Sequence, residues 1–418
     1  MTVVDVAVVG AGPAGSSAAV SLARLGYTVA LLDKRVFPRD KLCGDFLNPA
    51  SWPILNRLGV ARDVLERPHQ KVERFRFAFP DGQALVLPLV GRPGIFGLGL
   101  RRADLDHALM KRAALDGVTV FEGCRAKTLT REAAGWFLVT EGETQAQPIK
   151  ARVLVGADGR HSWVAQRAGL ARGPAAGRSV AFQWRARRPP GVGDAVEIHL
   201  MKGGYAGIVG VDHETINVCV AIERKRLASR ARAGTALGEW IGRSRSLEEI
   251  VGARLGAIRS TYPVYFSSRH PCADRVLLVG DAARVSEPVT GEGVYLALWS
   301  GLASARVVDQ AFRSGDFSHA ALAYGLKRFQ RPLRMRRRIN ALARSLVYRR
   351  GMLSAMMAFS AATERIVGAL VRATCEPDAR EPDCQSALRC VGDLSTETVD
   401  KSVDNSVPWK DDSAWNRR

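Results

Sequence analysis

The sequence has no Cys-x-x-Cys pair and no long apolar run. Its seven cysteines are scattered at spacings that exclude a zinc ribbon and a dithiol redox motif, and we predict no metal site. No apolar stretch approaches the roughly 20 residues that span a bilayer. The apolar start of the chain lacks a basic region and a cleavage site, so we interpret it as a strand and not as a signal peptide. These features favour a protein of the reducing cytoplasm.

Acidic residues are few relative to basic ones. The chain has 61 Lys and Arg against 41 Asp and Glu, which gives a formal net charge of +20. Such a balance is common in nucleic-acid-binding proteins, but we find no helix-turn-helix, zinc-finger or RNP pattern. The basic residues are mostly arginines in a chain rich in alanine and glycine, which is typical of compositional bias. We therefore predict no nucleic-acid partner.

The basic charge is concentrated towards the C-terminus. Residues 323–350 contain ten Lys or Arg and no acid, and an apolar stretch follows them. One interpretation is a pair of packed helices with solvated arginine faces. The other is peripheral contact of residues 323–371 with an anionic membrane, at its inner face. The polar residues 376–418 lack periodicity, and we predict that they are disordered.

The first 33 residues have the pattern of a dinucleotide-binding unit. An apolar run ends in Gly-Ala-Gly-Pro-Ala-Gly, small residues follow at helical spacing, and a second apolar run ends at Asp33. In such a unit Gly10 permits a tight turn, Gly12 lets the backbone approach a pyrophosphate, and Gly15 lets helix and strand pack closely. The helix N-terminus offers N–H groups to phosphates, and Asp33 can accept hydrogen bonds from ribose hydroxyls.

Three further segments favour FAD as the dinucleotide. One apolar run ends in Gly280-Asp281, where the carboxylate can reach a ribityl hydroxyl. The glycine-rich turn after it starts a helix whose N–H groups can face a flavin ring. A second run ends in Asp158-Gly159, and Arg102 opens a helix from which it can pair with phosphate.

These four segments, in this order, resemble the flavoprotein monooxygenase superfamily with the glutathione-reductase-type FAD fold. Two details, in residues 40–49 and 280–301, are more similar to the geranylgeranyl reductase family. The resemblance implies FAD as the cofactor, with the Cys43 loop near the flavin. The motifs and the resemblance together predict these FAD-binding residues: Gly10, Gly12, Pro13, Ala14, Gly15, Asp33, Lys34, Arg35, Cys43, Arg102, Asp158, Gly159, Gly280, Asp281, Pro288, Gly291, Glu292, Gly293 and Val294.

The sequence departs from the family pattern in two places. Geranylgeranyl reductases have a Tyr-x-Trp-x-Phe-Pro motif, whereas this chain keeps Tyr205 but has Gly207 and Gly210. Arg284 stands where the reductases have glycine and the hydroxylases histidine. The tryptophan motif of flavin halogenases is absent, so we do not expect halogenation.

The predicted fold class is α/β. A Rossmann-like FAD-binding domain of residues 1–70, 98–178 and 268–318 is interrupted by an antiparallel, substrate-binding sheet of residues 71–97 and 179–267. Helices of residues 319–375 follow, and residues 376–418 form the disordered tail. A second Gly-x-Gly-x-x-Gly is absent, so NAD(P)H is expected to bind only transiently as the electron donor.

We predict an FAD-dependent oxidoreductase acting on a small hydrophobic substrate of lipid, isoprenoid or polyketide-like type. Reduction of a C=C bond is preferred, hydroxylation of an aromatic or quinone-type substrate with NAD(P)H and O2 is the alternative, and a membrane-associated flavin-binding protein is the non-enzymatic one. Cys43 is the catalytic candidate, or else a small packed residue. Tyr205 and Arg284 are the substrate-binding candidates, or else core and solvent-facing residues respectively.

Overall fold

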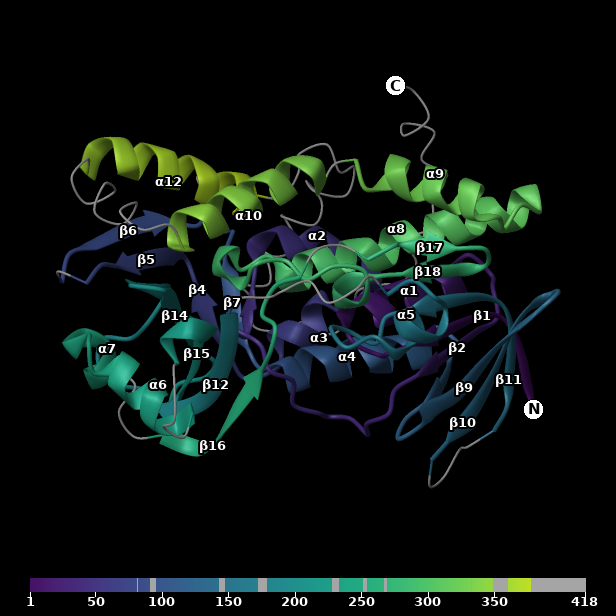
Figure 1. The fold of residues 1–418 in the computed structure, drawn as a ribbon, viewed down its shortest axis with the longest axis horizontal. Helices are drawn as coiled ribbons and strands as arrows, with labels where there is room; N and C mark the ends of the chain where they lie inside the picture. The colour runs from purple at the N-terminus through teal and green to yellow at the C-terminus, as the bar shows by residue number, and fades with distance from the viewer. Residues whose placement is uncertain are drawn as a thin grey trace, which may run out of the picture.

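Two sheets lie side by side beneath a layer of helices in the computed structural model (Figure 1). The structure describes residues 1–80, 82–90, 95–142, 147–171, 179–227, 233–250, 254–266, 269–331, 333–348 and 360–376. The predicted disordered tail lies, apart from Glu376, outside the described residues.

The first sheet has the Rossmann-like arrangement that the N-terminal pattern predicts. Its main path runs β17-β18-β11-β1-β2-β8, in which β18, β11, β1, β2 and β8 are parallel. The bounds are β1 Thr2–Val9, β2 Val29–Leu32, β8 Thr119–Phe121, β9 Arg125–Glu132, β10 Gly135–Glu141, β11 Ile149–Gly156, β17 Cys272–Ala273 and β18 Val276–Leu278. Helices cover it: α1 Pro13–Arg24, α4 Arg102–Leu115 and α8 Gly293–Ser314. β2 and the last four residues of β1 and of β11 are apolar because both faces of the sheet are buried there.

Glycines let the strands and helices around α1 approach closely. A Cβ atom on Gly15 would lie 1.8 Å from the carbonyl oxygen of Gly10, between β1 and α1. A Cβ atom on Gly301 of α8 would lie 2.3 Å from the carbonyl oxygen of Ala14. The predicted packing role of Gly15 is therefore visible in the structure.

The second sheet contains both insertions, in the order β16-β12-β15-β14-β13-β5-β6. The bounds are β5 Arg74–Ala78, β6 Ala84–Pro88, β12 Ser179–Arg187, β13 Ala195–Met201, β14 Gly204–Gly210, β15 Thr215–Glu223 and β16 Arg254–Thr261. The strand pairs of this sheet are antiparallel as predicted, except that β13 pairs with β5 in parallel. These two strands come from different insertions, so no hairpin sets their relative direction.

The two faces of the second sheet are covered differently. One face packs against α6 (Ala233–Ile241) and α7 (Arg245–Ile250), two helices that the sequence pattern did not predict, through buried Trp240 and Leu247. The other face looks towards the first sheet and towards helices near the C-terminus. It is this second face that carries the polar residues described below.

Smaller elements join the two sheets. A three-stranded sheet has the order β3-β7-β4. The bounds of these strands and of the short helices are β3 Phe46–Leu47, β4 His69–Val72, β7 Gly97–Leu100, η1 Pro49–Ser51, α2 Trp52–Leu58, α3 Ala61–Leu65, α5 Trp163–Arg167, η2 Arg224–Arg226, η3 Gly280–Ala282 and η4 Pro288–Thr290.

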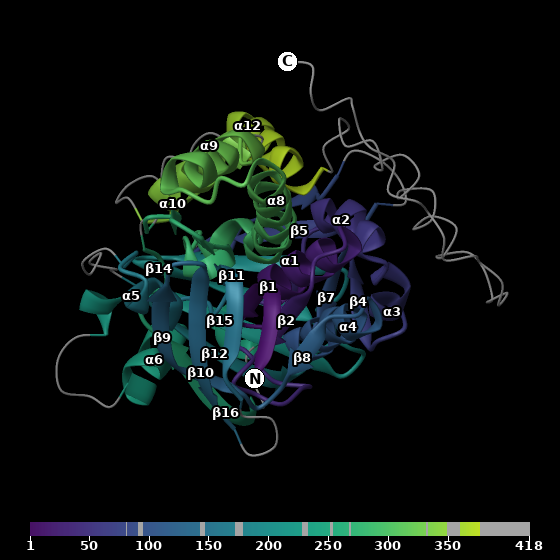
Figure 2. The same ribbon diagram turned by 90° about the vertical axis from the view of Figure 1, so that its right-hand side faces the viewer.

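Three helices form the layer above α8: α9 His319–Phe329, α10 Leu333–Tyr348 and α12 Ser360–Cys375 (Figure 2). Helix α10 buries Leu333, Ile339 and Val347 against the body of the protein, as expected for a packed amphipathic helix. Among the described helices, none combines the length and apolar character needed to cross a membrane. The proposed domain boundaries stay a prediction.

Candidate functional site

A cavity of about 730 Å³ lies at the carboxyl ends of the parallel strands. Gly10 follows β1, Asp33 follows β2, Asp158 follows β11 and Asp281 follows β18, and all four line it. Ligands of open α/β sheets bind at this edge. Lys34, Arg35, Gly12 and Gly159 line the cavity as well. The structure thus brings together the predicted residues from three of the four motifs.

Gly10 and Gly12, which follow β1, have different surroundings. Gly10 has φ +106°, and a Cβ atom there would lie 2.5 Å from the carbonyl oxygen of Ala157. At Gly12, the nearest atoms to a Cβ would be Nη2 of Arg39 at 3.8 Å and Nη2 of Arg102 at 4.0 Å. Gly12 therefore borders open space that faces two guanidinium groups.

Those two guanidinium groups are held by one buried carboxylate. Arg102 makes a bidentate pair with Asp106, with both N–O distances 2.8 Å, and Arg39 Nη1 lies 3.2 Å from the same carboxylate. Burial, the largest single cause, lowers the pKa of Arg102, but the charges and hydrogen bonds of Asp106 and Cys43 together outweigh it, so this pKa lies above its ordinary value. Two fixed cations beside the N-terminus of α1 suit a diphosphate. The Arg39 loop carries no motif, so the sequence did not reveal this residue.

The protein itself uses part of the hydrogen-bonding capacity of the Asp33 carboxylate. Its carboxylate accepts the N–H of Ala11 at 3.0 Å and of Arg35 at 3.0 Å, and pairs with Arg39 at 3.1 Å. A carboxylate has about four lone-pair positions, so it retains capacity for a ribose hydroxyl. The cavity volume, the open Gly12 and these donors and acceptors together fit FAD.

Asp158 has a structural role that its motif did not predict. It accepts hydrogen bonds from Ser162 Oγ at 2.5 Å and from the N–H of Val164 at 3.0 Å, and so caps α5. Burial nevertheless raises the pKa of this carboxyl. Asp281, by contrast, is partly exposed and lies 3.9 Å from Lys41 Nζ.

The Cys43 loop joins the cofactor side to the second sheet. The N–H of Cys43 donates to Gln183 Oε1 at 3.3 Å, and its carbonyl accepts from Asn217 Nδ2 at 2.9 Å and from Cys219 Sγ at 3.2 Å. Cys219 is 176 residues away along the chain, so no local pattern could have found it. The predicted position of Cys43 near the flavin and its catalytic role both stay predictions.

Asp45 links the cofactor side to β12. Its carboxylate accepts the N–H of Arg102 at 3.3 Å and forms an ion pair with Arg185. Burial raises the pKa of Asp45 to about 6 despite the neighbouring guanidinium groups. The residue lies in the left-handed region with φ 54°, which marks a sharp turn.

The glycine-rich turn before α8 is packed tightly on one side. Gly291 has φ +65°, and a Cβ atom there would lie 2.6 Å from Phe46 Cδ1. Gly293 begins α8, and a Cβ atom there would meet nothing within 4 Å. Glu292 is fully buried; its Oε1 lies 3.2 Å from Arg336 Nη1 on α10, whereas its Oε2 has no hydrogen-bond partner among the described residues. Burial raises the pKa of Glu292 to about 7.

Other predicted residues of these segments differ in their surroundings. Pro13 and Ala14 are buried in the first turn of α1, and Val294 is buried in the first turn of α8. Gly280 has φ +55° and donates its N–H to Ser300 Oγ at 2.9 Å. Pro288 is exposed and starts η4.

The substrate candidates Tyr205 and Arg284 lie in different environments. Tyr205 is buried and its hydroxyl donates to Oε1 of buried Glu287 at 2.9 Å. Burial raises the pKa of Glu287 to about 7. Arg284 is partly buried, and its Nε has no hydrogen-bond partner among the described residues. The pKa of Arg337 on α10 is lowered mainly by burial and, to a smaller extent, by the positive charge of Arg284.

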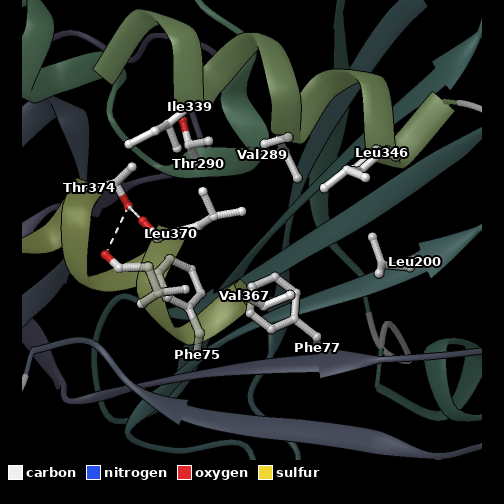
Figure 3. A pocket seen from close by; sticks show the side chains of 13 residues that line it. Phe75, Phe77, Leu200, Val289, Thr290, Ile339, Leu346, Val367, Leu370 and Thr374 are labelled. Carbon is white, nitrogen blue, oxygen red and sulfur yellow. Dashed lines mark hydrogen bonds between the residues drawn. The ribbon is translucent and has the colours of Figure 1, made fainter. Parts of the chain in front are cut away.

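A second, apolar cavity of about 80 Å³ lies next to the turn before α8 (Figure 3). Side chains enter it from β5, β13, η4, α10 and α12. The lining residues are Phe75, Phe77, Leu200, Val289, Thr290, Ile339, Ala343, Leu346, Val347, Val367, Leu370, Val371 and Thr374. It has room for roughly five to eight heavy atoms, and its walls are almost entirely hydrocarbon.

Comparisons with known proteins agree with this geometry. The FAD binding domain family matches residues 3–301. A digeranylgeranylglycerophospholipid reductase from Methanothrix thermoacetophila is 30% identical over 331 residues, which cover 75% of this chain and 79% of the relative.

Solved structures share the fold. A geranylgeranyl bacteriochlorophyll reductase-like protein from Thermoplasma acidophilum has a TM-score of 0.73 at 23% identity, over 93% of this chain and 96% of the other. The myxobacterial chondrochloren halogenase CndH has a TM-score of 0.75 at 21% identity, over 94% of this chain and 97% of the other. At these identities the likeness shows the fold alone. The family match and the reductase relative carry the assignment: the chain belongs to the FAD-binding-domain flavoproteins, within the group of the geranylgeranyl reductases, and is an FAD-dependent oxidoreductase.

Proposed function

We propose that this oxidoreductase reduces a C=C bond in an apolar lipid with an isoprenoid-type tail. The observation that carries the proposal is the apolar cavity of Figure 3. Its wall includes Val289 and Thr290, which directly precede the glycine-rich turn where the flavin is predicted to lie. Entry of a hydrocarbon into such a cavity lowers the free energy, whereas a polar substrate would lose its hydrogen bonds to water there. The reductase relative supports the same substrate class.

The reaction needs a hydride for one carbon and a proton for the other. When bound and reduced, FAD supplies the hydride. As the π bond breaks, two C–H bonds form, and the proton must come from the protein. We propose Tyr205 as its source: the hydroxyl gives its proton to the substrate carbon when Glu287 is protonated, and Glu287, whose pKa is about 7, returns a proton to it near neutral pH.

The remaining parts of the function are proposals of the same kind. NAD(P)H, bound transiently, is the proposed reductant. The proposed location is the cytoplasm, with peripheral contact at the inner face of the membrane, from which a lipid substrate can be withdrawn. Exposed apolar residues on the helices of the upper layer support such contact: Tyr324, Met335, Leu342 and Ile366.

The test uses the FAD-loaded protein, reduced anaerobically and mixed with a geranylgeranyl lipid. Return of the oxidised flavin absorbance without oxygen, together with a saturated product in the mass spectrum, is the expected result. No reoxidation with the lipid, combined with labelled oxygen from O2 in an aromatic or quinone-type product, would overturn the proposal in favour of hydroxylation.

A further inference from the structure

Three arginines lie near the start of the turn that precedes α8, and none of them has an acidic partner among the residues that the structure describes. Arg284 follows η3, and Arg334 and Arg337 are neighbours on one side of α10. By contrast, Arg102 and Arg336 each pair with a buried carboxylate. The described lining of the large cavity contains none of Arg284, Arg334 and Arg337. Neither pairing within the protein nor the cavity assigned to FAD therefore explains these three charges.

Hydrogen bonds between α10 and the turn fix where Arg284 and Arg337 lie. The side chain of Asn340 accepts the N–H of Glu287 at 3.0 Å and donates to the carbonyl oxygen of the same residue at 2.9 Å. Arg337 lies three residues before Asn340 on the helix, and residues at this spacing are neighbours on the helix surface. Arg284 lies three residues before Glu287 on the turn. The helix and the turn therefore each carry one arginine at the same step from this contact.

The charges of these arginines act on one another without compensation. Burial is the main cause that lowers the pKa of Arg337, and the two charges that add to it, those of Arg284 and Arg334, are both positive. Nη2 of Arg337 donates to Oε1 of Gln330 at 2.7 Å, but this amide is neutral. Nε of Arg284 is buried without a hydrogen-bond partner among the described residues. Like charges at close range and a buried donor without an acceptor both cost free energy, and one anion between the guanidinium groups would remove both costs.

We propose that Arg284, Arg334 and Arg337 form a binding site for the phosphate monoester group of a ligand other than FAD. Such a group carries about 1.5 to 2 negative charges near neutral pH and has three strong acceptor oxygens, so it suits several guanidinium groups better than a carboxylate does. Arg284 and Arg337 are partly exposed and Arg334 is exposed, so a ligand can reach them from solution. The site goes beyond the proposed function and does not depend on whether the flavin reduces a C=C bond.

The first experiment uses inorganic phosphate as the probe and the FAD-loaded protein, in which the cofactor fills its own diphosphate position. Sodium phosphate, compared with sodium chloride at equal ionic strength, should raise the unfolding temperature along a saturating curve, because a ligand that binds only the folded state stabilises it. Arg284→Gln and Arg337→Gln should each lose this rise. In chloride, Arg284→Gln should be at least as stable as the parent, because the substitution removes a like charge. Arg245→Gln is the control and should keep the rise, since Arg245 is an exposed arginine of α7.

Two results of this experiment would overturn the site. One is a parent protein that phosphate stabilises no more than chloride does, and the other is an equal phosphate effect in the parent and in Arg284→Gln. Circular dichroism and the flavin spectrum identify a variant that fails to fold. If Arg284→Gln fails in this way, the result for Arg337→Gln decides by itself.

The phosphate group can belong to a dinucleotide, as the 2′-phosphate of NADPH, or to the head group of an anionic lipid. A dinucleotide ligand predicts that NADP⁺ perturbs the flavin absorbance at concentrations at least about tenfold lower than NAD⁺, and that Arg284→Gln abolishes this difference. A lipid ligand predicts that dihexanoyl phosphatidic acid raises the unfolding temperature of the parent but not of Arg284→Gln, while NADP⁺ and NAD⁺ act alike. Either result supports the phosphate site. Equal behaviour of the parent and Arg284→Gln with all three ligands would refute it.

Discussion

The hydroxyl group of Tyr205 donates a hydrogen bond to Oε1 of Glu287 across 2.9 Å, between two side chains that are both buried. The backbone of Glu287 is held in addition by Asn340 of α10, whose side chain accepts its N–H at 3.0 Å and donates to its carbonyl at 2.9 Å. This contact set joins β14, the turn before α8 and the helical layer. It places one phenol and one carboxyl group of altered acidity at the junction of these three parts.

Tyr205→Phe removes the proposed proton donor without removing the ring. We expect the rate of lipid-dependent flavin reoxidation to fall by about a hundredfold, the lower range for loss of a general acid. FAD affinity should stay unchanged, because Tyr205 does not line the large cavity. Anaerobic single-turnover measurements across pH test this, and a rate and pH profile equal to the parent's would rule out the donor role.

Glu287 should make stability depend on pH. Its pKa is raised by burial from the ordinary 4.5 to about 7 in the folded protein, so the folded state binds the proton more tightly than the unfolded state. Its contribution is fully present below pH of about 4.5 and is lost as the pH rises through about 7. Glu292 behaves alike, with its pKa also about 7.

Urea unfolding at several pH values measures this dependence. The parent should lose stability between mildly acidic and mildly alkaline pH, by at most about 3 kcal/mol for each group. Glu287→Gln should flatten part of the slope, and Glu292→Gln a similar part. An unchanged slope in both variants would contradict the assignment of raised pKa values to these carboxyl groups.

Gly12→Val should give folded, colourless protein. The branched side chain would occupy the space between the α1 N-terminus and the guanidinium groups of Arg39 and Arg102, where we expect the pyrophosphate. Gly238→Ala is the control, because it lies on an exposed helix surface where a Cβ meets nothing within 4 Å. Absorbance and circular dichroism check both variants, and yellow Gly12→Val protein with full FAD would refute the phosphate position.

Arg39→Gln tests the cation that the sequence motifs missed. Loss of one charge-assisted hydrogen bond should weaken FAD binding by roughly tenfold or more. Fluorescence titration of the apoprotein with FAD measures this affinity. Arg62→Gln is the matched control, since Arg62 is exposed on α3 and pairs with Glu66. Equal affinities of the Arg39 variant and this control would exclude Arg39 from the phosphate site.

Membrane contact through residues 323–371 should depend on charge. We expect the protein to sediment with anionic liposomes, and less so as salt concentration rises. Leu342→Glu, an exposed position of α10, should weaken this sedimentation without loss of fold. Equal sedimentation with neutral liposomes would refute electrostatic attachment.

Features that depend on neighbours in the chain could be predicted from the residues alone. The strand, glycine turn and helix of residues 2–24 could be predicted because turn geometry and helical spacing are local properties. The antiparallel hairpin of β5 and β6 depends on neighbours in the chain in the same way. Gly10 and Gly15 are likewise required by close approach at the positions where the motif places them.

Tertiary structure alone decided which distant side chains meet. Arg39 is oriented on the phosphate side by Asp33 and by Asp106 of α4, and Cys219 reaches Cys43 because the Cys43 loop packs against β15 of the second sheet. The parallel pairing of β13 with β5 is a long-range choice as well. Such contacts join residues many positions apart, and neither periodicity nor composition contains that distance information; it arises when the two sheets pack together.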